Sequence, residues 1–224
     1  MAVTGLPAFQ PHVLYVDPHK IVQHTLEPHL SWVVWSALNL PRIVHQGFVL
    51  RLKYLLGRKG VFGGRWDLNS KPFTEREEYA LIEDLNQSLP QYQNSIWYQQ
   101  GEKAVSSKGV FAHKTETAHS TKELDAVFSD YLVPLLTSMK QEGYQQRPGA
   151  DLPEGMIGRD GALIKTAHGT HRLAAAKVTG ASGVFPIKVI GVHRLWLARI
   201  LERQDGAAPA VIEQALQSIQ ERYQ

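Results

Sequence analysis

The chain has 224 residues and a net charge of +3; 43% of its residues are hydrophobic and 20% are charged, as in an ordinary globular protein. It contains no cysteine, which excludes disulfide bonds, thiolate zinc sites and cysteine nucleophiles. The most apolar stretch, residues 30–40, is too short to span a bilayer, and residues 1–11 lack the basic start of a signal peptide. We therefore expect a cytoplasmic protein without a membrane partner.

The first third of the chain predicts a strand, a helix and a glycine-rich loop. Residues 13–16 are typical of a short strand, which an Asp-Pro pair ends. Residues 28–57 are apolar with mixed periodicity, and the hydrophobic spacing in their second half indicates a helix. A glycine-rich loop over 60–64 follows.

Two capping boxes in the middle of the chain predict helix starts. In Thr74-Glu75-Arg76-Glu77, the threonine hydroxyl can bond an amide of the first turn while Glu77 reaches back. The second box begins at Ser120, and Pro134 should kink or break the helix that follows it. Residues 86–119 are polar and rich in Gln and Ser, so we expect loops there with a short helix near 96–98.

The last third of the chain predicts alternating strands and helices. A linker rich in Gly and Pro over 143–154 precedes a β-hairpin with an Asp160-Gly161 turn, because Asp-Gly is the strongest short hairpin signal. Arg159 and Lys165 flank this hairpin, where we expect solvated charges. The remaining expected elements are a helix over 170–178 that Gly180 ends, a strand over 185–192, a helix over 194–203 and a last helix opened by Pro209.

The segment Ala167-His168-Gly169-Thr170-His171-Arg172, between a strand and a helix, is the strongest functional candidate. Gly169 permits a sharp turn and the close approach of a ligand, and Thr170 is a candidate N-cap. Amides at a helix N-terminus favour an anion, and Arg172 in the first turn can fork onto phosphate oxygens. His171 can donate to a phosphate or shuttle a proton. The pattern predicts a phosphate site; the alternative is an ordinary turn with surface His and Arg side chains.

A family resemblance rests on residues around this segment. Gly158-Arg159-Asp160-Gly161, Gly169 to Ala176, Gly180 and Pro186 to Val189 together resemble the ParB/sulfiredoxin superfamily, over about residues 154–192. The resemblance implies an α/β (α+β) fold, with a small mixed sheet surrounded by helices. It implies an N-terminal extension with the first strand (1–60), the core (61–204) and a C-terminal helix (205–224).

The resemblance also implies that Gly169, Thr170, His171 and Arg172, with His168 beside them, bind the phosphates of ATP, ADP or CTP. Two departures limit what can be transferred. Sulfiredoxins carry their catalytic cysteine where Thr170 stands, which argues against sulfinic-acid reduction, and many relatives carry an acid where His168 stands. Too few residues follow Gly180 for the helix-turn-helix domain of the DNA-partitioning members, so chromosome partitioning is disfavoured.

The leading hypothesis is a phosphotransferase that acts on a small-molecule acceptor, or an NTP hydrolase. His171 would stabilise developing charge with the assistance of Mg²⁺, and Asp67, which follows the glycine-rich loop, would be the base. The alternative for Asp67 is a cap of the next turn.

The alternative functions are a DNA-binding module or nuclease of the ParB-like type, and a non-catalytic interaction protein. The histidines match no metal-ligand spacing, so no metal ligands are assigned.

Overall fold

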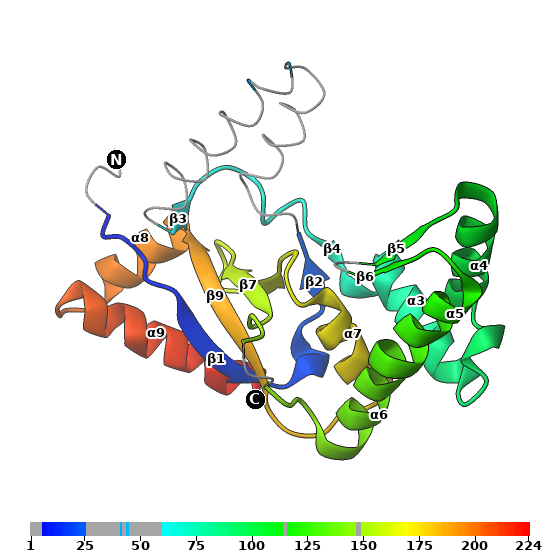
Figure 1. The fold of residues 1–224 in the computed structure, drawn as a ribbon. Helices are drawn as coiled ribbons and strands as arrows, with labels where there is room; N and C mark the ends of the chain where they lie inside the picture. The colour runs from blue at the N-terminus through cyan, green and yellow to red at the C-terminus, as the bar shows by residue number, and fades with distance from the viewer. Residues whose placement is uncertain (1–5, 26–40, 42–43, 45–59, 114–115, 147–148) are drawn as a thin grey trace. The chain divides into compact units, whose positions relative to one another are not determined.

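The computed structural model describes residues 6–25, 41, 44, 60–113, 116–146 and 149–224, and it has a mixed α/β fold, as predicted (Figure 1). The helix expected in the second half of 28–57 lies outside the described residues. The chain divides into two compact units, which interleave along the sequence instead of following one another. Unit 1 comprises Met1–Phe73, Asp151–Gly169 and Phe185–Gln224, and unit 2 comprises Thr74–Ala150 and Thr170–Val184.

Unit 1 contains a mixed sheet that has seven strands in the described part of the chain. The strand order is β1-β9-β7-β8-β2-β4, and β3 also pairs with β9. Strand β9 pairs antiparallel with β1 and parallel with β7, and most of its side chains are buried. The bounds are β1 His12–Val16, β2 Gln23–His24, β3 Val61–Phe62, β4 Lys71–Pro72, β7 Glu154–Ile157, β8 Leu163–Lys165 and β9 Phe185–His193.

The β7–β8 hairpin confirms the predicted Asp-Gly turn. Gly161 has a φ of 88°, a conformation that side chains disfavour, and its N–H donates to the carbonyl of Gly158 at 3.0 Å. Strands β7 and β8 pair antiparallel on either side of it. The turn chemistry at 160–161 therefore sets this hairpin locally, as the sequence indicates.

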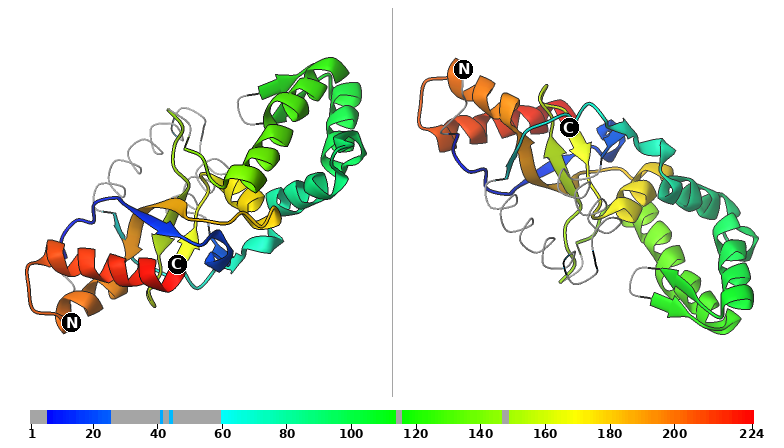
Figure 2. Two further views of the ribbon diagram at one scale, coloured as in Figure 1. Left: turned by 90° about the horizontal axis from the view of Figure 1, so that it is seen from below. Right: turned by 90° about the horizontal axis from the view of Figure 1, so that it is seen from above.

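Helices α8 (Arg194–Arg203) and α9 (Ala208–Tyr223) confirm the two predicted C-terminal helices of unit 1, with Pro209 in the first turn of α9. In Figure 2 the red helix α9 lies along the blue strand β1. The N–H of Tyr15 donates to Gln220 Oε1 at 2.8 Å, and Gln224 Nε2 donates to the Tyr15 carbonyl at 3.2 Å. Side chains of α9 thus occupy both backbone groups of Tyr15 on the outer edge of β1, which hinders pairing with another chain there.

Unit 2 consists mainly of helices, and one of them corrects the sequence prediction. Residues 96–108 form α4, although most of this polar region was expected to be loop. Ser95 caps α4 by accepting from the Tyr98 N–H, Gly109 ends it with a φ of 72°, and Trp97 is buried. The sequence pattern did not indicate this helix, because few of its residues are buried and most of the others are polar. The other elements are α3 Glu77–Ser88, β5 Phe111–His113, β6 Glu116–Ala118, α5 Thr121–Ala126, α6 Val133–Glu142 and α7 Thr170–Val178.

The two predicted capping boxes have different outcomes. Ser120 caps α5 by accepting from the Glu123 N–H at 3.2 Å, which confirms this box. The Glu123 carboxylate reaches back to the N–H of His119, one residue before the cap, in place of the N–H of Ser120 itself. The box at Thr74 is wrong. A 3₁₀ turn over Phe73–Glu75 delays the start of α3 to Glu77, which has no side-chain cap.

The predicted helix over 170–178 is confirmed, whereas Pro134 does not break the helical run in which it lies. A π-helical segment, Val127–Leu132, joins α5 directly to α6, and Pro134 lies in the first turn of α6, where a missing N–H is tolerated; a kink there stays a prediction. Helix α7 has the predicted bounds, and Gly180 follows it with a φ of 64°. Helix α7 contacts helices α3 and α6 within unit 2, and Leu173 is among its buried residues. No helix in the described part of the chain is long and apolar enough to cross a membrane.

Candidate functional site

The turn between β8 and α7 has a backbone that only glycine fits at residue 169. Gly169 has a φ of 80°, and a Cβ added there would lie 2.6 Å from Pro153 Cα. The neighbouring Glu154 N–H donates to the His168 carbonyl at 3.0 Å, which fixes the turn. The predicted sharp turn is confirmed. The group that approaches the backbone of Gly169 closely is Pro153, where the sequence led us to expect a ligand. His168 itself is exposed at the surface of this turn.

Lys165, the last residue of β8, supports the same turn from inside unit 1. Its side chain is fully buried, and Nζ donates to the carbonyls of Thr166, at 2.6 Å, and of His168. The expectation of a solvated charge is therefore wrong for Lys165. The sequence carries no signal for this burial, because β8 is only three residues long and the partners of Nζ belong to the turn. The amino group thus holds two carbonyls of the turn through hydrogen bonds.

Helix α7 begins at Thr170 itself, which is 4% exposed. Thr170 is thus inside the first turn of the helix and is not the N-cap residue that the sequence indicated. His171, next along α7, stacks on the indole of Trp97 with ring centroids 5.6 Å apart and an interplanar angle of 10°. Its ring also meets that of His113 edge-on at 4.9 Å. His171 therefore belongs to a packed aromatic cluster within unit 2, and its role in charge stabilisation stays a prediction.

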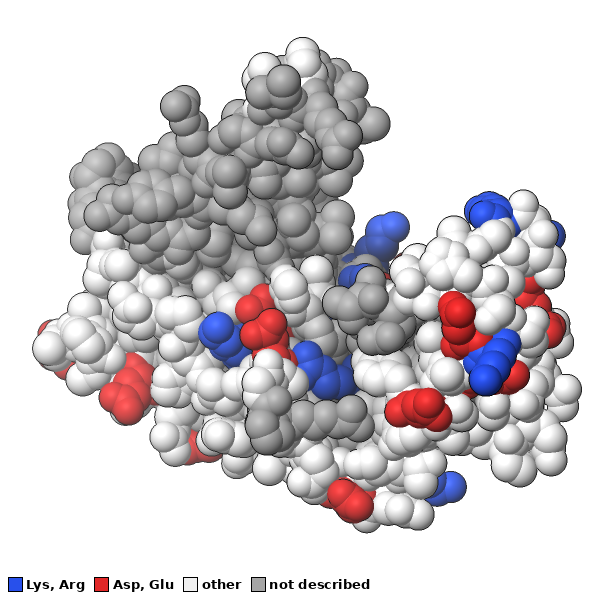
Figure 3. Space-filling model, viewed as in Figure 1, with Lys and Arg blue, Asp and Glu red and all other residues white. Residues whose placement is uncertain are grey.

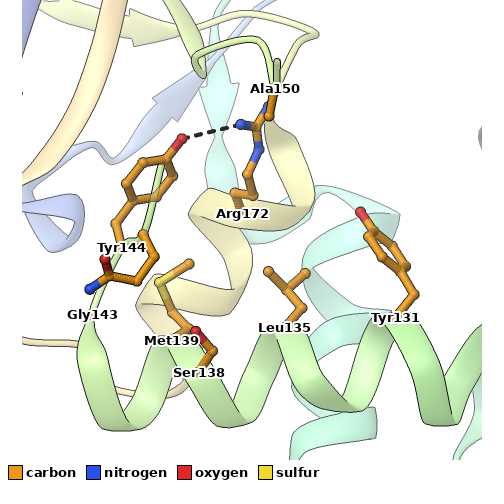
Figure 4. Close-up of a pocket in the computed structure, with 9 residues that line it drawn as sticks. Tyr131, Leu135, Ser138, Met139, Gly143, Tyr144, Ala150 and Arg172 are labelled. Atoms are coloured by element: carbon orange, nitrogen blue, oxygen red, sulfur yellow. Dashed lines mark hydrogen bonds between the residues drawn. The ribbon is translucent and has the colours of Figure 1, made fainter. Parts of the chain in front are cut away.

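Arg172 lies one residue further around α7 and lines a pocket of about 270 Å³, which we call the Arg172 pocket (Figure 4). Arg172 Nη1 donates to the Tyr144 hydroxyl at 3.2 Å, and that hydroxyl donates to Gln146 Oε1 at 3.0 Å. These bonds orient the guanidinium. Sequence reasoning missed Tyr144, because it follows α6 in the linker and no local pattern connects it with the phosphate box.

Asp67 belongs to unit 1, whereas His171 and Arg172 belong to unit 2. The Asp67 carboxylate is buried and accepts three hydrogen bonds from Arg159: from the backbone N–H at 2.9 Å, from Nε at 2.8 Å and from Nη2 at 2.9 Å. His193 Nε2 lies 3.9 Å from Asp67 Oδ1 and 3.2 Å from the Gly64 carbonyl oxygen. Arg159 is thus an ion-pair partner and not a solvated charge.

The surroundings of Asp67 and His193 displace both pKa values downward. Burial raises the pKa of Asp67, but the hydrogen bonds and charge of Arg159, with the charge of His193, outweigh it and hold the pKa below its usual value. Burial lowers the pKa of His193, against the opposing effects of the Gly64 carbonyl and of Asp67. A lowered pKa makes Asp67 a weaker base. Its geometry supports a structural role between the Gly-rich loop and the hairpin, and the catalytic role stays a prediction.

Acidification is expected to lower the free energy of unfolding in two stages, because both groups bind protons more readily in the unfolded chain. His193 contributes fully to the free energy of unfolding above pH 6.5. This contribution is lost as the pH falls from 6.5 through the lowered pKa of His193 in the native state. The contribution of Asp67 is full above 3.8 and is lost below that pH in the same way. Urea unfolding between pH 7.5 and pH 3 measures both stages.

Matched variants assign the stages of this pH profile. His193→Asn, which keeps an acceptor for the Leu195 N–H, should flatten the first stage. Asp67→Asn should reduce the second, to which Glu78 also contributes because Arg76 lowers its pKa. The exposed His12→Gln is the control and should keep the wild-type profile. A first stage that persists unchanged in His193→Asn would show that other groups produce it.

Comparison with known proteins returned no match among family models, curated proteins or solved structures. Among the described residues, no group of three or more His, Asp or Glu side chains gathers to hold a metal ion. The resemblance to the ParB/sulfiredoxin superfamily is therefore a prediction from the sequence alone.

Proposed function

We propose that this chain is a nucleotide-binding protein that holds phosphate groups at residues 168–172, where β8 leads into α7. The observation that carries the proposal is the position of Arg172 in the first turn of α7. Its side chain lines a pocket, and Tyr144 orients its guanidinium by a hydrogen bond. The partial positive charge of a helix N-terminus and a guanidinium fork both favour phosphate oxygens. Gly169, which directly precedes α7, has a φ of 80° that disfavours other residues.

The proposed activity is phosphoryl transfer to a small molecule, or hydrolysis of a nucleoside triphosphate. Arg172 would neutralise phosphate charge, and the exposed His168 is available at the turn to donate a hydrogen bond. The Mg²⁺ would enter bound to the nucleotide, as Mg²⁺ commonly does, because the described residues present no cluster of carboxylates and histidines. The resemblance to the ParB/sulfiredoxin superfamily leads to the same expectation.

A thermal-shift experiment tests the proposal with ATP, ADP, CTP and GTP, each in the presence of Mg²⁺. A ligand that binds only the native state stabilises it by about 2.7 kcal/mol at a concentration of 100 Kd. We expect one of these nucleotides to raise the melting temperature of the wild type, and Arg172→Ala to lose most of that shift. Arg199→Ala, which removes an exposed arginine of α8, is the matched control and should keep the shift.

If none of the four nucleotides stabilises the wild type at millimolar concentration, the proposal is wrong. If the shift survives Arg172→Ala unchanged, a nucleotide binds elsewhere in the chain. The described side chains on the face drawn in Figure 3 give the nucleic-acid alternative no support. On the face that Figure 3 shows, the described Lys and Arg side chains are interspersed with Asp and Glu, whereas nucleic-acid-binding surfaces gather basic residues.

A further inference from the structure

The Arg172 pocket has an apolar floor and a polar rim (Figure 4). Leu135 and Met139 are four residues apart on α6, so they lie on one face of that helix and form the floor together. Arg172 approaches from α7, and the Tyr144 hydroxyl points toward it. Ser138 and Tyr131 add hydroxyl groups to the lining. All of these residues belong to unit 2.

The charge of the pocket selects for anions. Of the described residues that line it, Arg172 alone carries a charge. This side chain is half-buried, so its charge is screened less than a fully exposed one. A guanidinium held in one orientation by a neighbouring hydroxyl is well suited to a carboxylate or a phosphate group. The floor, in contrast, favours binding of an apolar group, because contact with Leu135 and Met139 removes that group from water.

The volume of the pocket limits the size of the ligand. At about 270 Å³, the pocket is slightly smaller than the range of roughly 300–1,000 Å³ that is usual for small-molecule sites. A ligand that fills the pocket is therefore compact, about the size of one ring or one branched chain.

We propose that the Arg172 pocket is a binding site for a compact amphipathic anion, a small molecule with an apolar body and a single phosphate or carboxylate group. The body contacts Leu135 and Met139, and the anionic group contacts Arg172. This site goes beyond nucleotide binding, because it requires no nucleotide, although the two sites share Arg172. A molecule of this class is the kind of acceptor that a phosphotransferase would use.

Calorimetric titration of the full chain tests the proposal with phenyl phosphate, phenylacetate, inorganic phosphate and phenol as probes. We expect at least one of the two amphipathic anions to bind, and phenol and inorganic phosphate to bind at least roughly tenfold more weakly than it does. The comparison of phenyl phosphate with phenylacetate shows which anionic group is preferred. Arg172→Gln should weaken the better probe by roughly ten- to hundredfold, because a charged hydrogen-bond donor is lost, and Arg172→Lys should restore part of the affinity.

Two neighbouring positions on α6 provide a matched pair of variants. Ser138→Trp places a large ring in the pocket and should abolish binding of the anionic probe, whereas Thr137→Trp places the same ring on the exposed side of α6 and should preserve it. Melting temperatures confirm that both variants fold; if Ser138→Trp does not, Leu135→Phe takes its place. The proposal is overturned if neither anion binds the wild type, or if phenol binds as tightly as the better anion. It is also overturned if Ser138→Trp or Leu135→Phe folds and binds that anion as tightly as the wild type does.

The same variants separate this inference from nucleotide binding. If a nucleotide stabilises both the wild type and Ser138→Trp, and no compact anion binds, nucleotide binding stands and the pocket proposal falls. If phenyl phosphate or phenylacetate binds but no nucleotide does, the pocket proposal stands and the nucleotide proposal falls.

Discussion

Replacement of Gly169 by alanine is expected to lower the free energy of unfolding by roughly 2–5 kcal/mol. Two effects add. The φ of 80° is a left-handed conformation that costs an L-residue about 1–2 kcal/mol. The new methyl group would also lie 2.6 Å from Pro153 Cα and 2.7 Å from Pro153 Cβ, and such crowding typically costs about 1–3 kcal/mol. Urea unfolding at neutral pH measures the sum.

Gly180→Ala is the matched control for this substitution. Gly180 also has a positive φ, of 64°, but among the described residues nothing lies within 4 Å of an added Cβ. Its replacement should therefore cost only the conformational part, about 1–2 kcal/mol. If the two variants lose the same stability, the contact with Pro153 contributes nothing. Because the turn at Gly169 also forms the proposed phosphate site, Gly169→Ala should weaken nucleotide binding as well, whereas Gly180→Ala should not.

Replacement of Trp97 by alanine is expected to lower the free energy of unfolding by roughly 3–5 kcal/mol, as for other buried tryptophans. Trp97 is 5% exposed, and its ring contacts Phe128 at 5.8 Å, His113 at 5.0 Å and His171 at 5.6 Å between centroids. The substitution would leave a cavity at the centre of the aromatic cluster of unit 2. Thermal and urea unfolding measure the loss.

Ile96→Ala is the control on the same helix, because the Ile96 side chain is 54% exposed and its truncation should change stability by less than about 0.5 kcal/mol. The imidazole resonances of His171 report the local effect, since ring currents from Trp97 act on the stacked ring. Unchanged His171 resonances in a folded Trp97→Ala variant would contradict the stacked arrangement.

Much of the fold can be predicted from local patterns in the sequence. The Asp160-Gly161 pair predicts the hairpin, Gly180 the end of α7 and Pro209 the start of α9, because each of these residues restricts its own backbone. Helix α4 could not be predicted in the same way. Its buried positions, such as Trp97, are few, and its Gln and Ser residues resemble a loop. Its hydrophobic pattern makes sense only with the neighbouring helices in place.

The candidate site divides between local and long-range determinants. The sequence by itself determined the turn at Gly169 and the presence of Arg172 in the first turn of α7, because a positive φ and helix phase depend on neighbouring residues. The tertiary structure decided what each side chain meets. Asp67 binds Arg159, 92 residues away, and Arg172 meets Tyr144, 28 residues away, in a pocket on α6. Burial and charge pairing come from segments that are distant in the chain, and no local pattern encodes them.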